Sequence, residues 1–307
     1  MEFPQGVYLG CKHPLVPPLM NGGGCCKTVD HVRELSRSLA GAILIGSFTK
    51  EERMGNSGNV WWVGSGAALN SLGMPNGGED YLKAHLSEMV TIAHDAGKIL
   101  VVNVAGDNSE EYASLTALSF DLGADAVEEN LGCPNVVKDD GSRKPIASFD
   151  IAVMEEIIST VQREVGREAA VWVKVSPYSD PDLLKKSSAV ISVYEVVKAV
   201  TAVNTFPSAY GLDDHGNPVI SVGLAGLSGR ALKHIGLGQI KQWRDVLPGQ
   251  IGLIAAGGIS TGQDIADYRL VGANGFQMTT ELLRTGNLNP GAFGRVALEY
   301  SELPSYS

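Results

Sequence analysis

Eight short runs of apolar residues alternate along this chain with longer amphipathic segments, and this alternation restricts the fold more than any other feature of the sequence. Near-continuously apolar strands separated by helical segments are typical of a parallel sheet covered on both faces. Eight such units favour a closed (β/α)8 TIM barrel over an open doubly wound sheet. The expected strands are Leu15–Met20, Ala42–Ser47, Ile99–Val104, Ala126–Leu131, Ala170–Val175, Val200–Asn204, Ile251–Ala256 and Gly275–Thr279.

Many of the helical segments between these strands open with Ser, Asp or Thr, which are preferred helix caps. A single domain over residues 1–307 suffices, because barrels commonly run to about 250 residues. The expected helices are Val29–Leu39, Asp80–Ala96, Ser109–Leu122, Phe149–Val165, Pro181–Lys198, Leu232–Val246, Gly262–Val271 and Pro290–Tyr300.

Composition and charge exclude several classes of protein. Hydrophobic residues make up 44% and charged residues 19% of the chain, as in ordinary globular proteins. The formal net charge of −10 argues against a nucleic-acid partner, which would require an excess of Lys and Arg. No apolar stretch reaches the roughly 18 residues that span a bilayer, and Met1–Leu9 lacks the pattern of a secretory signal. We therefore expect a cytoplasmic protein with no membrane partner.

The spacing of the four cysteines matches no zinc or iron–sulfur motif, so we expect no metal site. Cys11, Cys25 and Cys26 are interpreted as structural thiols, which the cytosol would keep reduced.

Two long interruptions follow the second and sixth expected strands, at Thr49–Gly78 and Thr205–Arg230. Each should rise from the carboxyl ends of the strands, where barrel active sites form. Long ordered loops there are more often functional than decorative. Val137–Ala147 has the composition of a mobile flap that could close over the site and exclude water.

The stretch from Asn130 to Asn135 places one thiol, Cys133, between two carboxamides where an apolar run ends. A lone cysteine is often only a small buried hydrophobe. Pro134, however, favours an extended, loop-edge conformation for Cys133. We interpret Cys133 as a group that takes a proton from a flat polar ring held by the neighbouring amides.

Glycines and threonines follow the last two strands, at Gly257, Gly258, Thr279 and Thr280. Backbone N–H groups at such turns, with the positive end of the next helix dipole, can hold the phosphate that barrels commonly bind there. A tight turn explains a Gly-Gly pair equally well. A third cluster, Val222–Gly229, either approaches the same phosphate or forms a lid or turn.

Lys174 is a charge at the end of an apolar strand. A buried lysine is rare unless it is paired, so a barrel-facing Lys174 implies an anion or an electron-rich ring, such as a reduced flavin. The alternative is that it points outward among the helices.

Four asparagines occupy strand ends or the first long loop: Asn70, Asn130, Asn135 and Asn204. Singly, each could be a turn or capping residue. Together, with Thr205, they would form a carboxamide cage for a planar ring that bears N–H and C=O groups.

With these motifs in place, the chain resembles the dihydroorotate dehydrogenase family from about Leu15 to Leu283. The most specific matches are Asn130–Asn135, Leu69–Asn76 and Gly257–Gly262. The resemblance implies an FMN-containing barrel that oxidises dihydroorotate to orotate, in which a base removes the C5 proton while hydride passes from C6 to the flavin N5. Cys133 matches the base of the soluble class, where the membrane-bound class has serine.

The resemblance also assigns the two halves of the site. It implies substrate contacts at Asn70, Leu72, Gly73, Met74, Asn130, Asn135, Asn204 and Thr205. It implies FMN contacts at Asn21, Gly22, Gly23, Gly46, Ser47, Asn103, Asn130, Lys174, Asn204, Gly223, Gly226, Gly257, Gly258, Thr279 and Thr280.

The block from Asn70 to Asn76 is similar to the fumarate-using soluble subclass, and nothing resembles the amphipathic N-terminal extension of the quinone-using class. The resemblance therefore favours fumarate or an electron-transfer subunit as the oxidant. A homodimer is expected.

Three positions depart from the family pattern. Gly46 stands where the soluble classes carry a lysine that reaches flavin and substrate carboxylate, Gly132 replaces a usual Ser, and Thr279 a usual Gly. The first departure leaves a second hypothesis open, an FMN-dependent enzyme for another dihydropyrimidine or unsaturated cyclic amide. A third is a barrel that binds flavin or a phosphate ligand without this chemistry.

Overall fold

The computed structural model describes residues 2–3, 6–136 and 142–304, and it contains a closed barrel of eight parallel strands. The strands follow one another around the barrel in the order β1-β12-β11-β8-β7-β6-β5-β2. The predicted TIM barrel is confirmed. Its strands are β1 (Leu19–Asn21), β2 (Ala42–Phe48), β5 (Ile99–Val104), β6 (Ala126–Asn130), β7 (Val171–Val175), β8 (Val197–Ala202), β11 (Gly252–Ala256) and β12 (Gly275–Met278).

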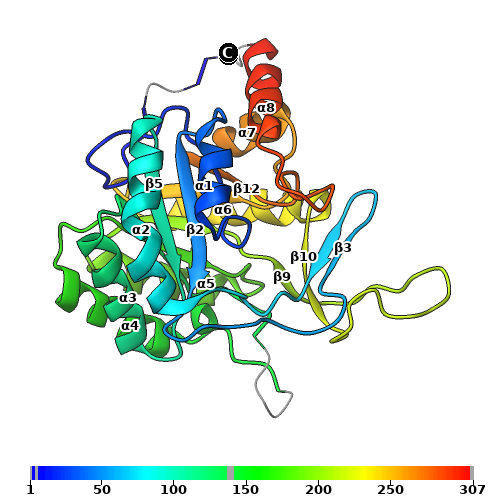
Figure 1. Cartoon of the computed structure of the whole chain (residues 1–307), viewed down its shortest axis with the longest axis horizontal. Coiled ribbons are helices and arrows are strands. Elements are labelled where there is room, and N and C mark those ends of the chain that lie inside the picture. The colour runs from blue at the N-terminus through cyan, green and yellow to red at the C-terminus, as the bar shows by residue number, and fades with distance from the viewer. Residues whose placement is uncertain (1, 4–5, 137–141, 305–307) are drawn as a thin grey trace.

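Helices alternate with these strands and cover the outside of the barrel (Figure 1). Capping side chains start several of them: Thr28, Asn108 and Asp150 each accept a hydrogen bond from a backbone N–H of the first turn. The helices are α1 (Val29–Ser36), α2 (Gly78–Asp95), α3 (Ser109–Asp121), α4 (Ile151–Val165), α5 (Pro181–Val193), α6 (Lys233–Val246), α7 (Gly262–Leu270) and α8 (Gly291–Glu302). None of the helices in the described ranges is both long and apolar enough to cross a membrane.

Two element boundaries differ from the prediction by four residues or more. The first strand begins at Leu19 instead of Leu15, because Pro17 and Pro18 have no N–H to donate to a ladder. The predicted helix Pro181–Lys198 ends at Val193, and its last residues enter β8 instead. The chain passes directly from one apolar segment to the next there, with no Gly or Pro to mark the change.

The two long interruptions form a second sheet, which the sequence did not predict. Its strands are β3 (Trp61–Val63), β4 (Ala68–Asn70), β9 (Phe206–Ala209) and β10 (Ala225–Ser228), in the antiparallel order β3-β4-β10-β9. Figure 1 shows β3, β9 and β10 projecting together from one side of the barrel. Loops whose paired residues Asn70 and Gly226 lie 156 positions apart in the sequence are thereby joined over the site.

Alternation along the strands decides which side chains face the barrel interior. Ala126 packs in the inner cluster with Trp172, whereas Val127 packs in the outer cluster between strands and helices. The N-terminal segment closes the far end of the barrel, where the Trp172 indole donates to the Leu9 carbonyl at 2.8 Å. Even-numbered positions of β6 and β7 therefore point inward, and those near the strand ends point into the site.

Candidate active site

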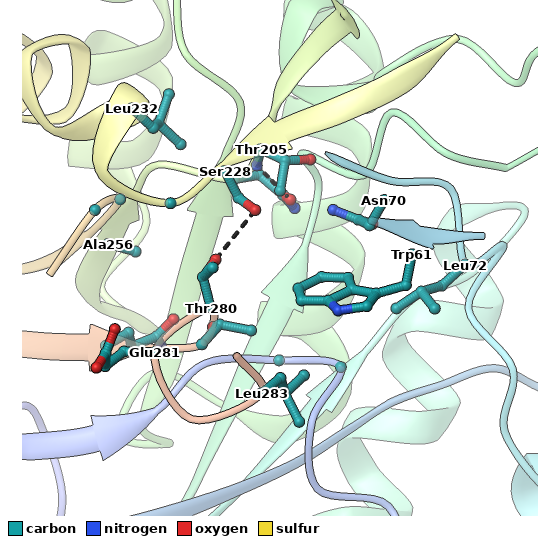
Figure 2. Close-up of a pocket in the computed structure, with 18 of the residues that line it drawn as sticks. Trp61, Asn70, Leu72, Thr205, Ser228, Leu232, Ala256, Thr280, Glu281 and Leu283 are labelled. Carbon is teal, nitrogen blue, oxygen red and sulfur yellow. Dashed lines mark hydrogen bonds between the residues drawn. The ribbon is translucent and has the colours of Figure 1, made fainter. Parts of the chain in front are cut away.

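A cavity lies over the carboxyl ends of the barrel strands and extends beneath the second sheet. Figure 2 shows Trp61 from β3 beside Asn70 and Leu72, facing Thr280 and Leu283 on the opposite wall. One end of this cavity contains Cys133, and the opposite end contains the glycine turns that follow β10 and β11. A pocket of this kind, with few convergent polar groups, is typical of a ligand or cofactor site.

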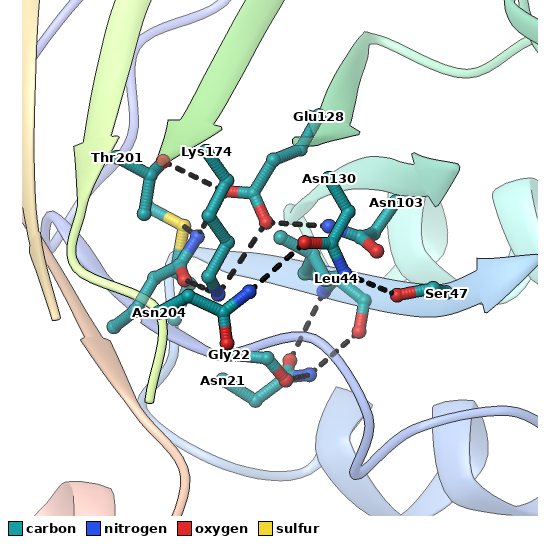
Figure 3. A network of polar contacts seen from close by, with 12 residues as sticks. Asn21, Gly22, Leu44, Ser47, Asn103, Glu128, Asn130, Lys174, Thr201 and Asn204 are labelled. Carbon is teal, nitrogen blue, oxygen red and sulfur yellow. Dashed lines mark hydrogen bonds and ion pairs between the residues drawn. The ribbon is translucent and has the colours of Figure 1, made fainter. Parts of the chain in front are cut away.

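The floor of the cavity holds a buried ion pair (Figure 3). Lys174 Nζ lies 3.7 Å from Glu128 Oε1 and donates to Gln277 Oε1 at 2.9 Å. The Glu128 carboxylate is fully buried and accepts further hydrogen bonds from Asn103 (2.7 Å), Thr201 (2.7 Å) and Gln277 (2.6 Å). Lys174 therefore faces the barrel interior, as one of the two interpretations predicted, and the buried Glu128 carboxylate balances its charge.

Two pairs of carboxamides line the end of the cavity that contains Cys133. Asn204 donates to Asn130 Oδ1 at 2.9 Å, and Asn130 donates in turn to Ser47 Oγ at 2.9 Å. Asn135 donates to Asn70 Oδ1 at 2.8 Å. The four asparagines converge on one cavity, as the sequence indicated.

Several oxygens at this end have no partner within the described residues. They include Asn135 Oδ1 and Thr205 Oγ1, which belong to residues that line the cavity, and Asn103 Oδ1, which lies behind the cavity-lining Gly23. Buried acceptors are normally satisfied, so unpaired ones facing a cavity are consistent with a bound polar ligand.

Cys133 follows β6 and lines the cavity between the two amide pairs. Burial raises the pKa of its thiol above the ordinary value, and the Asn135 N–H and the charges of Lys144, Arg53 and Lys174 partly oppose this shift. At neutral pH the sulfur is therefore mainly a thiol, which must lose its proton before it can act as a base.

Gly132 has no room for a side chain. A Cβ there would lie 2.5 Å from the Ser176 backbone nitrogen. A serine at this position, which the resemblance led us to expect, would collide with the chain at the end of β7, so the Cys133 loop packs closely there.

The opposite end of the cavity carries glycine turns and hydroxyl groups. Gly257 and Gly258 have positive φ angles of 123° and 74°, and Thr280 Oγ1 donates to Ser228 Oγ at 3.1 Å. The N–H groups of Ser260 and Thr261 both donate to Asp264 Oδ2 at 2.8 Å. The two N–H groups just before α7 are thus occupied by a carboxylate of the helix itself, and the glycine turn that precedes them is left to meet an anion.

Most of the predicted site residues line this one cavity. These are Gly23, Ser47, Asn70, Leu72, Gly73, Met74, Asn130, Cys133, Asn135, Lys174, Asn204, Thr205, Gly257, Gly258, Thr279 and Thr280. Six others do not line it: Asn21, Gly22, Gly46, Asn103, Gly223 and Gly226.

Three of these six residues have identifiable surroundings in the structure. Asn21 bridges β1 and β2 by hydrogen bonds to both backbone groups of Leu44, and Gly226 in β10 packs behind Thr205 and Asn135. Gly223 lies in a turn near Tyr210, so of the third glycine cluster it is Ser228 and Gly229 that reach the cavity. The predicted flap Val137–Ala147 lies partly outside the described residues.

Sequence reasoning missed three residues of the site. Glu128 is the counter-ion of Lys174, and its only signal was a pair of glutamates inside an apolar strand. Lys27 follows β1 and Trp61 comes from an unpredicted strand, and both line the cavity. No local pattern marked either of them.

The other three cysteines are buried and free, and burial raises the pKa of Cys11 to about 12 and of Cys25 to about 11. Across the described part of the chain, no three His, Cys, Asp or Glu side chains gather as a metal site would need.

Comparison with known proteins gives consistent matches. The sequence model of the dihydroorotate dehydrogenase family matches residues 10–292. The dihydroorotate dehydrogenase (fumarate) of Kluyveromyces lactis is 29% identical over 90% of this chain and 86% of its own. The dihydroorotate dehydrogenase B (NAD(+)) catalytic subunit of Methanopyrus kandleri is 31% identical over 86% of this chain and 79% of its own. The crystal structure of the Eimeria tenella enzyme in complex with ferulenol has 19% identity, a TM-score of 0.77, and coverage of 93% of this chain and 81% of that one.

Proposed function

Because the chain belongs to the dihydroorotate dehydrogenase family, we propose that it is an oxidoreductase that converts dihydroorotate to orotate in pyrimidine biosynthesis, with FMN as its cofactor. The observation that carries this proposal is the convergence of Cys133, four asparagines and Lys174 on one cavity. These groups come from four separate segments of the chain.

The residues present fit an FMN. A planar ring with N–H and C=O groups would meet the unpaired Asn103 Oδ1 and the Lys174 ammonium, and the glycine turns and the Ser228 and Thr280 hydroxyls would hold a phosphate. When bound, FMN supplies a two-electron acceptor.

The protein's own residues would prepare the substrate. The amide pairs would fix the pyrimidine ring by its N–H and C=O groups, with C5 toward the Cys133 sulfur. Cys133, as thiolate, would take the C5 proton and become a thiol, while two electrons leave C6 as hydride. A positioned base of this kind typically contributes about 10²- to 10⁴-fold to the rate.

The oxidant is proposed from the relatives. Those of Kluyveromyces lactis and Trypanosoma cruzi are named for fumarate, which favours fumarate over an electron-transfer subunit. A homodimer and a cytoplasmic location remain predictions.

A second candidate is oxidation of another dihydropyrimidine, and Gly46 is the observation that favours it. Anaerobic titration of the flavin-loaded protein with dihydroorotate and with dihydrouracil separates the two. We expect dihydroorotate to bleach the yellow flavin band. Bleaching by dihydrouracil alone would reject dihydroorotate as substrate, and a protein purified without flavin would reject both.

A further inference from the structure

Among the described residues, one partly buried cation of the cavity has no counter-ion. Among the described residues, four basic side chains line the cavity. Lys174 and Arg284 lie 3.7 and 3.6 Å from glutamate carboxylates, and Arg230 is exposed. Lys27 is the fourth: it is only partly exposed, and no carboxylate of the described residues lies within 4.0 Å of it.

The Lys27 ammonium lies at the end of the cavity that contains Cys133. Its Nζ donates to the Pro75 carbonyl at 2.7 Å, directly after the Leu72–Met74 loop that lines the cavity. Cys133 is close enough for a charge on its sulfur to affect the Lys27 pKa. One acceptor uses one of three ammonium protons, so two remain for a ligand.

A partly buried cation without an anion is costly, and burial lowers the pKa of Lys27 to about 8. A ligand carboxylate would supply both the missing charge and the missing acceptor. Neutral carboxamides dominate the rest of this end, so they can hold a ring but cannot neutralise a carboxylate.

We propose that Lys27 is the anion-recognising residue of the substrate site and binds the carboxylate of the pyrimidine. This inference rests on the proposed function and adds the residue that selects a charged substrate over a neutral one.

The fold explains why this cation comes from the loop after β1. Gly46 has a φ of 109°, and a Cβ there would lie 2.3 Å from the Asn103 carbonyl oxygen, so β2 cannot carry a lysine at that position. The Gly46 N–H donates to the Cys26 carbonyl at 2.8 Å. The residue that follows Cys26 is Lys27, so the loop brings its ammonium to the same corner of the cavity.

The test is calorimetric binding of orotate and of its neutral methyl ester to flavin-loaded wild type and Lys27→Met. Orotate should bind roughly 10- to 150-fold more weakly to Lys27→Met, since a charge-assisted hydrogen bond is lost. The ester should lose less than about threefold. Lys83→Met is the matched control, because it removes the same charge from an exposed lysine paired with Glu79 on α2.

Lys27→Met removes an unpaired, partly buried charge, so it should fold with an unchanged or higher melting temperature. Equal orotate affinity in wild type and Lys27→Met would overturn the assignment of Lys27 and leave the proposed function intact. Failure of orotate to bind wild type, with dihydrouracil still reducing the flavin, would instead overturn the proposed function and with it the inference.

Discussion

Lys174 Nζ lies 3.7 Å from Glu128 Oε1 inside the barrel, and both side chains are almost completely buried. The two residues lie on the neighbouring strands β6 and β7 at inward-pointing positions offset by two residues, because Glu128 pairs with Trp172 and Lys174 pairs with Asn130. Because the Glu128 carboxylate already balances the Lys174 charge, a reduced flavin would lie against an ion pair and not against a lone cation. The electrostatic potential at the flavin would therefore depend on both residues.

Removing one member of this pair should destabilise the fold. Lys174→Met leaves a buried carboxylate without its cation, which we expect to cost about 3–5 kcal/mol of unfolding free energy. Lys174→Met combined with Glu128→Gln should recover much of that loss. Denaturant unfolding of wild type, both single variants and the double variant measures the coupling; additive changes would show that the two charges do not interact. Flavin content should fall in both proteins that lack Lys174.

Cys133→Ala should leave flavin bound and reduce the rate of flavin reduction by dihydroorotate about 10²- to 10⁴-fold, because the base is lost. Cys133→Ser should keep some activity, more at high pH. Stopped-flow reduction under anaerobic conditions gives the rates. A wild-type rate in the alanine variant would make Cys133 a structural residue.

Cys133 and Lys27 predict opposite effects of pH, the first on the rate of flavin reduction and the second on orotate affinity. The raised pKa of Cys133 means that the thiolate fraction, and with it flavin reduction at saturating dihydroorotate, rises up to tenfold per pH unit through and above neutrality. Orotate affinity should fall above about pH 8 as Lys27 loses its proton. Its titratable neighbours in the described chain are the Cys25 and Cys133 thiols and the ring of His31, whose Nδ1 accepts the Lys27 backbone N–H.

Lys27→Met separates these effects. It should abolish most of the fall in orotate affinity while the rise in reduction rate remains. An equally steep fall in the variant would assign the pH dependence of binding to the cysteines.

Gly46→Ala should prevent stable folding or flavin binding, because its Cβ would meet the Asn103 carbonyl at a φ of 109°. Gly24→Ala is the control: its φ is 100°, yet no atom lies within 4 Å of its Cβ. Melting temperatures should show a much larger loss at Gly46. Comparable losses would mean that backbone strain, not the contact with β5, explains the glycine.

Glu129→Gln should stabilise the protein at pH 8 more than at pH 5. Burial raises the pKa of Glu129 from 4.5 to about 8, against a hydrogen bond from Thr116 that favours the charged form. The folded protein therefore holds a proton that the unfolded chain releases above its own pKa, and stability is lost as pH rises through about 8. Glutamine has no proton to lose. Unfolding free energies at both pH values, with exposed Glu168→Gln as control, measure this difference; a pH-independent effect would contradict it.

The alternation of apolar runs with capped amphipathic segments was enough to predict the barrel, since strand period and helix period are written locally in the chain. The same reasoning placed Cys133, the asparagines and Lys174 at strand ends, where a parallel barrel brings them together. One boundary error, at the passage from α5 into β8, fell where the sequence has no local mark, whereas the start of the first strand was marked by Pro17 and Pro18.

Only the tertiary structure determined which residues of the site contact one another. Glu128 and Glu129 are neighbours in sequence, yet the strand pleat directs one into the site beside Lys174 and the other against Thr116 on α3. Lys27 is held at the cavity by a hydrogen bond to Pro75, 48 residues away in the sequence. Position 46 has no room for a side chain, because the Asn103 carbonyl of β5 lies too close. Contacts between distant segments depend on packing and on loop conformation, which no short stretch of sequence encodes.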